Sequence, residues 1–515
     1  MKKKLLTLLL AVSVFLSGCW QELPAEDPSD LIVDDSPPVE TPPAPAADTR
    51  PAEFTLGWLP DVTLDPLTCP DGMHLTLAPL LYEGLFRLDD SFIPQPVLCS
   101  ELSCNDTGTV WTFRIRSDIL FSDGSALTAA DVAAALNRAR DTDRYRSRLS
   151  GISQVTRKND IVTVTLSAPN TSLPALLDIP VVKSGTEKAG KPLGTGPYAL
   201  AEDDRGTHLQ AADTYRASVA LPVQTIRLLD CSGSNALRHQ FSSQNVQLIT
   251  ADLIGSDPYT PVGSIRISDA DTTVLQYIGF NTSRPIFADA AVRNALGLGI
   301  DRKTLTEACL AGHALPAQSP ISPRSSLYPA MLDVDYSLTT FTEAMAAAGC
   351  AEGTMREVSL LVNEENSFKL SAARYIAESL SVCDIRITVR ALPWEEYLTA
   401  LQTGDFDLYY GEVRLTADWD LRQLVGSGGS LNYAGYGNTA VDAFLNSCAS
   451  AAEDNRAEAH LRLFRFLRMQ APILPLCFRR TSVLTHADVV EGLSPIAADP
   501  FNGLEHIHIN LKESP

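Results

Sequence analysis

The stretch VLQYIGFNT, residues 274–282, opens the part of the chain whose pattern decides the fold class. Residues 274–280 predict a strand because Val, Ile, Tyr and Phe favour the pleated surface of a sheet. Helices then alternate with strands as far as residue 412. The expected strands are 274–280, 358–362, 385–392 and 406–412, and the expected helices are 288–299, 301–311, a segment ending near 381, and 394–402. This alternation predicts α/β units.

Further strands are predicted before this part, at residues 54–59, 110–116 and 161–166. The stretch at 110–116 alternates apolar and polar residues with period 2, which is typical of a half-buried strand. Residues 79–88 are expected to form a helix or turn. Thr128 is expected to open a helix that ends near Arg140, because its hydroxyl can cap free N–H groups and Asp131 lies in the positive first turn.

The N-terminus predicts an exported lipoprotein. Three lysines at residues 2–4 precede an apolar run at 5–16, and the stretch LSGC at 16–19 follows the pattern of a lipobox. A basic region, a short apolar region and a small-residue cleavage site are the signature of a secretory signal. The run is shorter than the roughly 20 residues that span a membrane. We therefore expect cleavage after residue 18 and a lipid on Cys19.

Residues 19–52 are rich in proline and acidic residues, so they predict an extended linker that cannot bury enough apolar surface to fold. The whole chain has 515 residues, with 45% hydrophobic and 20% charged residues. This composition is that of a globular protein. Single cores usually stop growing at roughly 250–300 residues, so two or more lobes are expected.

The protein is strongly acidic, with a formal net charge of −21 that becomes −24 when the three lysines of the signal are removed. A negative field of this size repels nucleic acid and anionic lipid head groups, so no nucleic-acid partner is expected. The charge is compatible with cationic or zwitterionic ligands, although solubility alone is the favoured explanation.

The chain has ten cysteines, Cys19 and nine others. Nine is an odd number, so at least one thiol stays unpaired in a monomer. No CxxC pair occurs, which argues against a thioredoxin-like site or a zinc ribbon. Cys99 and Cys104 are close enough in sequence to form a disulfide, and buried free thiols explain the set equally well.

Six stretches in order resemble the family 5 extracellular solute-binding proteins of ABC importers, which include oligopeptide-, dipeptide- and nickel-binding lipoproteins. They are LLYEGLFRLD (80–89), FSDGSALTAADV (121–132), GTGPY (194–198), GFNT (279–282) followed by VRNAL (292–296), GDFDL (404–408) and PILPL (472–476). The resemblance covers about residues 54–512. Residues 99–102 and 505–508 depart from the family pattern, which weakens any transfer of the exact substrate but not of the fold.

The resemblance implies an α/β, two-lobed fold of the periplasmic-binding-protein type (class II, cluster C) with an extra inserted domain. The implied segments are the signal 1–18, the lipid-anchored linker 19–52, domain I at 53–82, 189–269 and 479–515, the inserted domain II at 83–188, and domain III, the second lobe, at 270–478. Hinges are expected where the chain crosses between lobes, at 268–277 and 476–481. Closure around a ligand would be a hinge motion.

Asp418 is the main candidate ligand-binding residue. In the peptide-binding members of this family, an aspartate in the loop after the strand corresponding to 406–412 holds the ligand's α-ammonium group, and Asp418 matches best, with Asp420 second. A buried carboxylate needs a partner, and an ammonium supplies charge-assisted hydrogen bonds. The alternative is that Asp418 caps a helix at 419–425. Arg414 is a candidate for a peptide carboxylate, or for a structural ion pair.

Aromatic residues are expected to line part of the cleft. Trp419 lies in the candidate loop, Tyr277 lies at a predicted hinge, and Tyr433 is a third candidate. Trp394 is expected to pack in the core. Residues 58–62 are expected to offer backbone groups to a peptide's main chain.

No metal site and no cofactor are expected. His506 and His508 would share one strand face, yet a single pair falls short of the ligands that a metal site uses. Cys309 and His313 are discounted because Gly312 should end their helix. Residues 426–430, GSGGS, lack the lysine of a phosphate-binding loop. No HExxH or GxSxG motif occurs, so no enzyme is predicted.

The sequence therefore predicts a lipid-anchored, extracytoplasmic binding protein that captures peptides and delivers them to ABC permease subunits. It is expected to be a monomer that contacts the membrane through its lipid. Alternatives are a nickel chelate or another small solute as ligand, a surface peptide sensor without transport, and a hydrolase.

Overall fold

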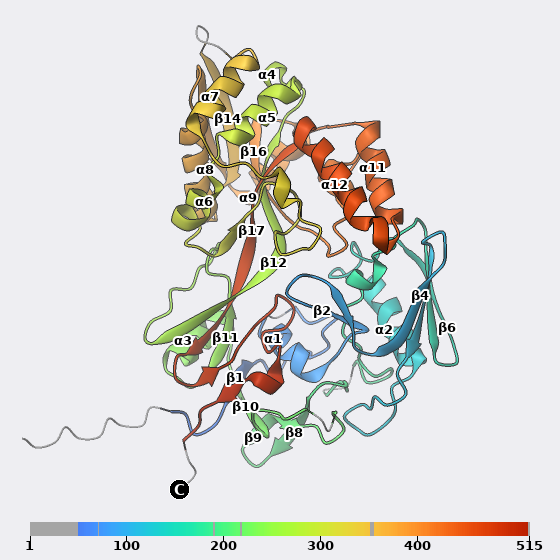
Figure 1. Ribbon diagram of the computed structural model, residues 1–515. Coiled ribbons are helices and arrows are strands. Elements are labelled where there is room, and N and C mark those ends of the chain that lie inside the picture. Colours follow the sequence, from blue (N-terminus) through green and yellow to red (C-terminus); the bar gives the residue numbers. More distant parts are fainter. Residues whose placement is uncertain (1–49, 71, 189–190, 217–218, 351–354, 513–515) are drawn as a thin grey trace, which may run out of the picture. The chain divides into compact units, whose positions relative to one another are not determined.

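The structure is a computed structural model that describes residues 50–70, 72–188, 191–216, 219–350 and 355–512. The predicted signal peptide, Cys19 and the linker up to residue 49 lie outside the described residues. The described part forms two lobes, each containing sheets and helices (Figure 1). None of the helices in the described ranges is both long and apolar enough to cross a membrane.

One sheet of the first lobe combines distant segments of the chain. Its strand order is β1 (Thr55–Trp58), β10 (Thr225–Asp230), β9 (Gly206–Ala211) and β8 (Tyr198–Asp203). β1 pairs in parallel with β10, and the other pairs are antiparallel. Helix α1 (Gly72–Leu81) contributes Leu77 and Leu80 to the core of this sheet. The expected helix or turn at 79–88 is only partly right, since residues 86–88 form strand β2 (Phe86–Leu88), which pairs with β3 (Pro94–Pro96).

A second sheet lies between β1 and β8 in the sequence. Its antiparallel order is β4 (Cys99–Cys104), β5 (Val110–Ile115), β7 (Ile161–Leu166) and β6 (Ile152–Lys158). β5 and β7 bury every second residue, as the predicted alternation requires. Helix α2 (Ala129–Asp141) begins with the predicted cap, where the Thr128 N–H donates to the Asp131 carboxylate at 3.1 Å. The short 3₁₀ helix η1 (Leu173–Leu176) follows β7.

The second lobe is built on a mixed sheet. Its order is β11 (Leu248–Ala251), β17 (Ile473–His486), β12 (Ile265–Phe280), β16 (Leu408–Arg414), β14 (Arg356–Asn363) and β15 (Ile385–Leu392), with β13 (Ala314–Pro316) paired to β17. β14 runs parallel to both β15 and β16. One face of the sheet packs on α5 (Ala290–Leu298), α7 (Leu338–Ala347) and α8 (Ser367–Leu380). The other packs on α9 (Trp394–Thr403), α11 (Thr439–Ser450) and α12 (Glu453–Gln470). The predicted α/β alternation is thus present.

Two long strands belong to both lobes. β12 and β17 pair antiparallel, from Ile265 opposite His486 to Gly279 opposite Ile473. The pairing is irregular between Asp271 and Leu275. Near Ile265 this pair adjoins β11, which pairs with β17, and from Val274 onward β12 pairs with β16. This irregularity falls within the segment 268–277, where the chain was expected to cross between the lobes. Hinge motion at this segment and the exact domain boundaries stay predictions.

Shorter elements complete the described chain. They are α3 (Ser234–Ser242), α4 (Pro285–Ala288), α6 (Arg302–Thr304), the π-helical turn η2 (Leu305–Cys309), the 3₁₀ helices η3 (Ala330–Leu332) and η4 (Leu504–His506), α10 (Arg422–Val425), and the paired strands β18 (Val490–Glu491) and β19 (His508–Ile509). Cys99 and Cys104, at the two ends of β4, both carry free thiols, so the disulfide considered for them is not formed.

Candidate functional site

Asp418 lies in the loop that follows the central strand β16. Its Oδ1 accepts a hydrogen bond from Thr416 Oγ1 at 2.5 Å, and its Oδ2 accepts one from Asn170 Nδ2 at 2.8 Å. The side chain is partly exposed, yet burial among protein atoms raises the pKa of its carboxyl. A carboxylate that is desolvated and still accessible is a group that a cationic ligand can stabilise.

The helix-cap alternative for Asp418 is wrong. The expected helix at 419–425 is only α10, which begins at Arg422. Asp420 occupies the local structural role instead, because its carboxylate accepts from the Arg422 backbone N–H at 3.0 Å and pairs with the Arg422 guanidinium at 2.7 Å. Asp420 therefore has its own cation, while Asp418 accepts hydrogen bonds from neutral groups.

Trp419 anchors the loop in the core of the second lobe. Its side chain is 4% exposed, and its ring meets those of Phe92 and Phe478 edge-on at 5.4 and 6.1 Å between ring centroids. Trp419 and Phe92 both have positive φ angles, 56° and 64°. Such backbone is uncommon for bulky residues and persists only where the surroundings impose it. The packing of Trp419 thus holds Asp418 in place rather than offering a ring to a ligand.

An ion pair from the first lobe lies close to Asp418. Arg148, in the loop after α2, forms an ion pair with Asp178. Burial lowers the pKa of Arg148, and the Asp418 charge acts in the opposite direction. One positive and two negative groups, Arg148 with Asp178 and Asp418, leave this cluster with a net charge of −1. One ligand cation would neutralise it.

Arg414 ends strand β16, four residues before Asp418. Within the described part of the chain its guanidinium makes no ion pair or hydrogen bond, and the residue is exposed. Burial by the surrounding protein nevertheless lowers the pKa of the group. The structural ion pair considered for Arg414 is therefore not formed, although the charges of Glu412, Arg479 and Asp252 act on it.

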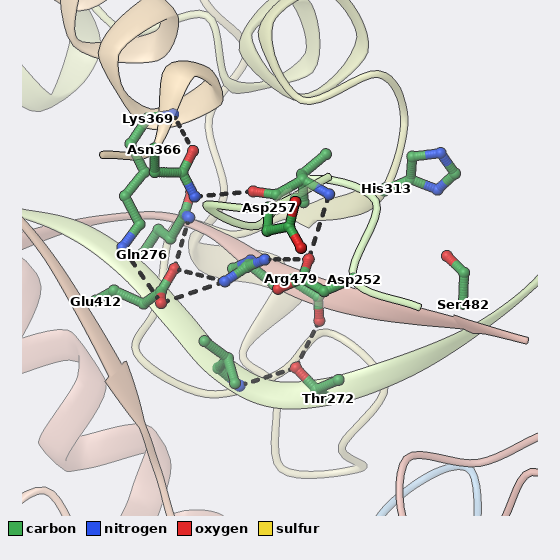
Figure 2. Close-up of polar contacts among 12 residues, drawn as sticks. Asp252, Asp257, Thr272, Gln276, His313, Asn366, Lys369, Glu412, Arg479 and Ser482 are labelled. Atoms are coloured by element: carbon green, nitrogen blue, oxygen red, sulfur yellow. Dashed lines mark hydrogen bonds and ion pairs between the residues drawn. The ribbon is translucent and has the colours of Figure 1, made fainter. Parts of the chain in front are cut away.

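Glu412, on the same face of β16 as Arg414, centres a buried polar network that crosses three strands (Figure 2). Its carboxylate receives Gln276 Nε2 at 2.8 Å, an Arg479 guanidinium nitrogen at 3.1 Å and Lys369 Nζ at 3.3 Å. Arg479 also pairs with Asp252, in the turn after β11.

The network and Arg414 together are cationic. Arg414, Lys369 and Arg479 carry three positive charges, while Glu412 and Asp252 carry two negative ones, a net of +1. Burial raises the pKa of Glu412, but Lys369 and Arg479 outweigh it, so the pKa is lowered overall.

Sequence reasoning missed most of these residues. Arg479 lies 67 residues from Glu412, and Asn170 lies 248 residues from Asp418. Only Glu412 could have been found from the local sequence. It lies two residues before Arg414 at the end of an apolar strand, so the two side chains must lie on the same face of that strand. The other partners come from separate elements that meet only in the fold.

The tyrosine candidates take different places. Tyr277 is 3% exposed, and its ring lies over Gly411, where an added Cβ would meet its Cζ at 2.4 Å. It meets the ring of Tyr409 edge-on at 5.7 Å, and Tyr433, which is partly exposed, meets Tyr409 from another side at 6.0 Å. Burial raises the pKa of Tyr277 well above its usual value. Tyr277 is therefore core, while Tyr433 keeps accessible surface.

Two further expectations are altered by the structure. Trp394 is 47% exposed and stacks on Tyr397, so it is not the core residue that was expected. Among residues 58–62, the Leu59 N–H already donates to His74 Nε2 at 2.9 Å, which removes one backbone donor from any peptide contact.

The histidine pair does not form the expected arrangement. His506 ends the 3₁₀ helix η4, whereas His508 begins β19, so the two do not share one strand face. Gly312 has a positive φ of 78°, and Nδ1 of the neighbouring His313 lies 3.0 Å from the Asp269 carboxylate. Within the described ranges no three His, Cys, Asp or Glu side chains cluster as metal ligands.

Comparison with known proteins identifies relatives along most of the chain. The model of the bacterial extracellular solute-binding proteins, family 5 Middle, matches residues 94–428. The glutathione-binding protein GsiB of Escherichia coli (strain K12) is 24% identical over 474 residues, which cover 84% of this chain and 89% of that protein.

Solved structures extend the likeness to the fold. The oligopeptide-binding protein AppA of Bacillus subtilis, in complex with a nonapeptide, has a TM-score of 0.60 at 19% identity and covers 90% of this chain and 99% of its own. The nickel ABC transporter structure from Bacillus halodurans has a TM-score of 0.71 at 18% identity, covering 89% and 98%. These likenesses confirm the predicted two-lobed α/β fold.

Proposed function

Because the chain belongs to the bacterial extracellular solute-binding proteins of family 5, we propose that it captures short zwitterionic peptides and passes them to an ABC permease. Proteins of this family bind peptides or related solutes for ABC importers and are not enzymes, so the prediction of a non-enzymatic binding protein is confirmed. The short peptide and the roles of single residues are the proposal.

The observation that carries the proposal is the opposite charge at the two ends of one loop. The cluster around Asp418 has a net charge of −1, and the cluster around Arg414 has a net charge of +1. A zwitterion complements both, with its ammonium on Asp418 and its carboxylate on Arg414. Four residues of chain extend at most about 14 Å, so a ligand held at both ends is a peptide of only a few residues.

Asp418 has the chemistry for the ammonium end. Burial penalises its charge, and an ammonium would restore the lost solvation with charge-assisted hydrogen bonds. Arg414 has the chemistry for the carboxylate end, because its guanidinium is unpaired among the described residues and can donate two parallel bonds. Tyr433 supplies accessible aromatic surface, whereas Asp420 is occupied by Arg422.

Replacing Arg414 by glutamine is expected to weaken binding of alanine peptides with a free carboxylate by about 10- to 100-fold, the usual worth of a hydrogen bond to a charged group. Isothermal titration with di-, tri- and tetraalanine measures the effect. Peptides with an amidated C-terminus should lose little. Arg386→Gln is the matched control, since Arg386 is 67% exposed and its nearest acid is 4.0 Å away. Equal losses for free and amidated peptides would refute the role of Arg414.

We also propose that the protein is held at the membrane by a lipid on Cys19. The support is the order of the basic residues at 2–4, the apolar run at 5–16 and the LSGC stretch. In the native bacterium, Cys19→Ser should move the protein from the membrane fraction to the soluble fraction, as immunoblotting would detect. Cys104→Ser, which alters a thiol of the folded part, should leave it at the membrane. Retention of the Cys19→Ser protein would exclude the anchor.

A further inference from the structure

The loop after β7 reaches across to the second lobe through two consecutive residues. Asn170 Nδ2 donates to Asp418 Oδ2 at 2.8 Å. Thr171 donates its N–H to the Ala449 oxygen at 2.9 Å and its hydroxyl to the Ala451 oxygen at 2.6 Å. These bonds join the region of β4–β7 to the end of α11, where the two parts adjoin in Figure 1.

Asn170 is held rigidly by its own lobe. The Trp111 indole N–H donates to its backbone oxygen at 3.0 Å, and its backbone N–H donates to the Gly108 oxygen at 2.9 Å. The Ser172 N–H donates to its amide Oδ1 at 2.8 Å, which fixes the orientation of the side chain. A side chain fixed in this way can position a ligand group without first losing much conformational freedom.

Asn170 and Asp418, which form the hydrogen bond between the lobes, can each accept a further hydrogen bond. Oδ1 of Asn170 has two acceptor positions, and among the described residues it receives one donor, the Ser172 N–H. Oδ2 of Asp418 likewise receives one, Asn170. Two unfilled acceptor positions thus belong to side chains already in contact, one from each lobe. An ammonium, with three donors and no acceptor, can use both.

We propose that Asn170 is a specificity-determining residue that forms, with Asp418, a two-sided acceptor site for a primary ammonium group of the ligand. This inference rests on the proposed function and adds the contribution of the opposite lobe. The Asp418 carboxylate supplies the charge, and the Asn170 amide oxygen supplies a second acceptor only when the lobes are in contact. Binding of a primary amine is thereby coupled to lobe closure.

The test compares two cations of equal charge that differ in their number of N–H donors. N,N-dimethylation of an alanine peptide keeps the positive charge of its amino group but leaves a single N–H, enough for Asp418 alone. The probes are the tightest-binding of di-, tri- and tetraalanine and its dimethylated form, measured by isothermal titration. Wild-type protein should prefer the primary amine by about tenfold, as one hydrogen bond implies, and Asn170→Ala should reduce the preference to about twofold or less.

Thr171→Ala is the matched control. It removes a cross-lobe bond from the neighbouring residue without touching Asp418, so it should weaken both peptides alike and keep the preference. Circular dichroism would confirm that both variants fold. An unchanged preference in Asn170→Ala would overturn the proposal, and tighter binding of the primary amine would show that Asn170 competes with the ligand. If no alanine peptide binds the wild-type protein, the proposed function itself fails.

Discussion

Arg479→Met is expected to lower the free energy of unfolding by about 2–3 kcal/mol. Removing one member of a buried ion pair leaves the other charge uncompensated, which costs about 3–5 kcal/mol when both are fully buried. We expect a smaller loss of about 2–3 kcal/mol here because Asp252, one of the two partners of Arg479, is half exposed. Glu412 would keep Lys369 at 3.3 Å as its remaining cation. Urea unfolding followed by circular dichroism measures the change.

The charges around Arg479 give the physical reason. Burial lowers the pKa of Arg479, but Glu412 and Asp252 outweigh it, and the pKa is raised overall. The guanidinium therefore stays charged and links the turn after β11 to strand β16 through β17 (Figure 2). Arg386→Met, on the surface of β15, should change stability by less than about 0.5 kcal/mol. A loss below about 1 kcal/mol in Arg479→Met would show that the network contributes little to stability.

Asp418→Asn should weaken binding of alanine peptides with a free amino group by about 100-fold. Asparagine has nearly the same shape, so the loss comes from the missing charge opposite the ammonium, for which truncation of a desolvated pair costs about 2–5 kcal/mol. N-acetylated peptides lack that charge and should bind the variant no worse than the wild type. Isothermal titration of both peptide forms gives the comparison.

Asp420→Asn is the control for Asp418→Asn. It removes a carboxylate two residues away that already pairs with Arg422, so peptide affinity should change by less than about threefold. If Asp420→Asn lost as much peptide affinity as Asp418→Asn, the result would indicate that the ammonium binds at Asp420. Equal losses of free and acetylated peptides in Asp418→Asn would rule out ammonium recognition there.

The pH dependence of binding follows from the same carboxylate. Burial raises the pKa of Asp418, the nearby Asp420 adds to this, and the bonds from Thr416 and Asn170 oppose it. An ammonium pairs with the ionised form only, so affinity is full above this raised pKa and falls as the pH drops through it. The decline should begin at a higher pH than an ordinary aspartate would cause, and it should vanish in Asp418→Asn.

Local patterns predicted only part of the sheets and helices, since the long strand β17 and the helices α11 and α12 were not expected. Strand β15 runs from Ile385 to Leu392 as expected, and β5 buries alternate residues as its period of 2 requires. Such elements follow from which face of a strand is buried, and that information is local. The expected helix at 419–425 failed because Trp419 is packed against Phe92 and Phe478 in a left-handed conformation that no helix continues through.

The site was only half predictable. Asp418 and Arg414 became candidates because Asp418 lies in the loop that the family resemblance marks and Arg414 ends the strand before that loop. Asn170 and Arg148 were not, because nothing in the loop after β7 or the loop after α2 marks them as neighbours of Asp418. Contacts over such separations arise from packing of whole elements, and a single sequence carries no direct record of them.

By itself, the sequence determined the α/β class, the family and the loop in which the candidate carboxylate lies, because each depends on patterns within short segments. Only the tertiary structure decided which charges share a site. It assigned Asp420 to Arg422, left Arg414 unpaired among the described residues, joined Glu412 to Lys369 and Arg479, and placed Asn170 against Asp418. The reason is that charges interact through space over a few ångströms, whatever their separation along the chain.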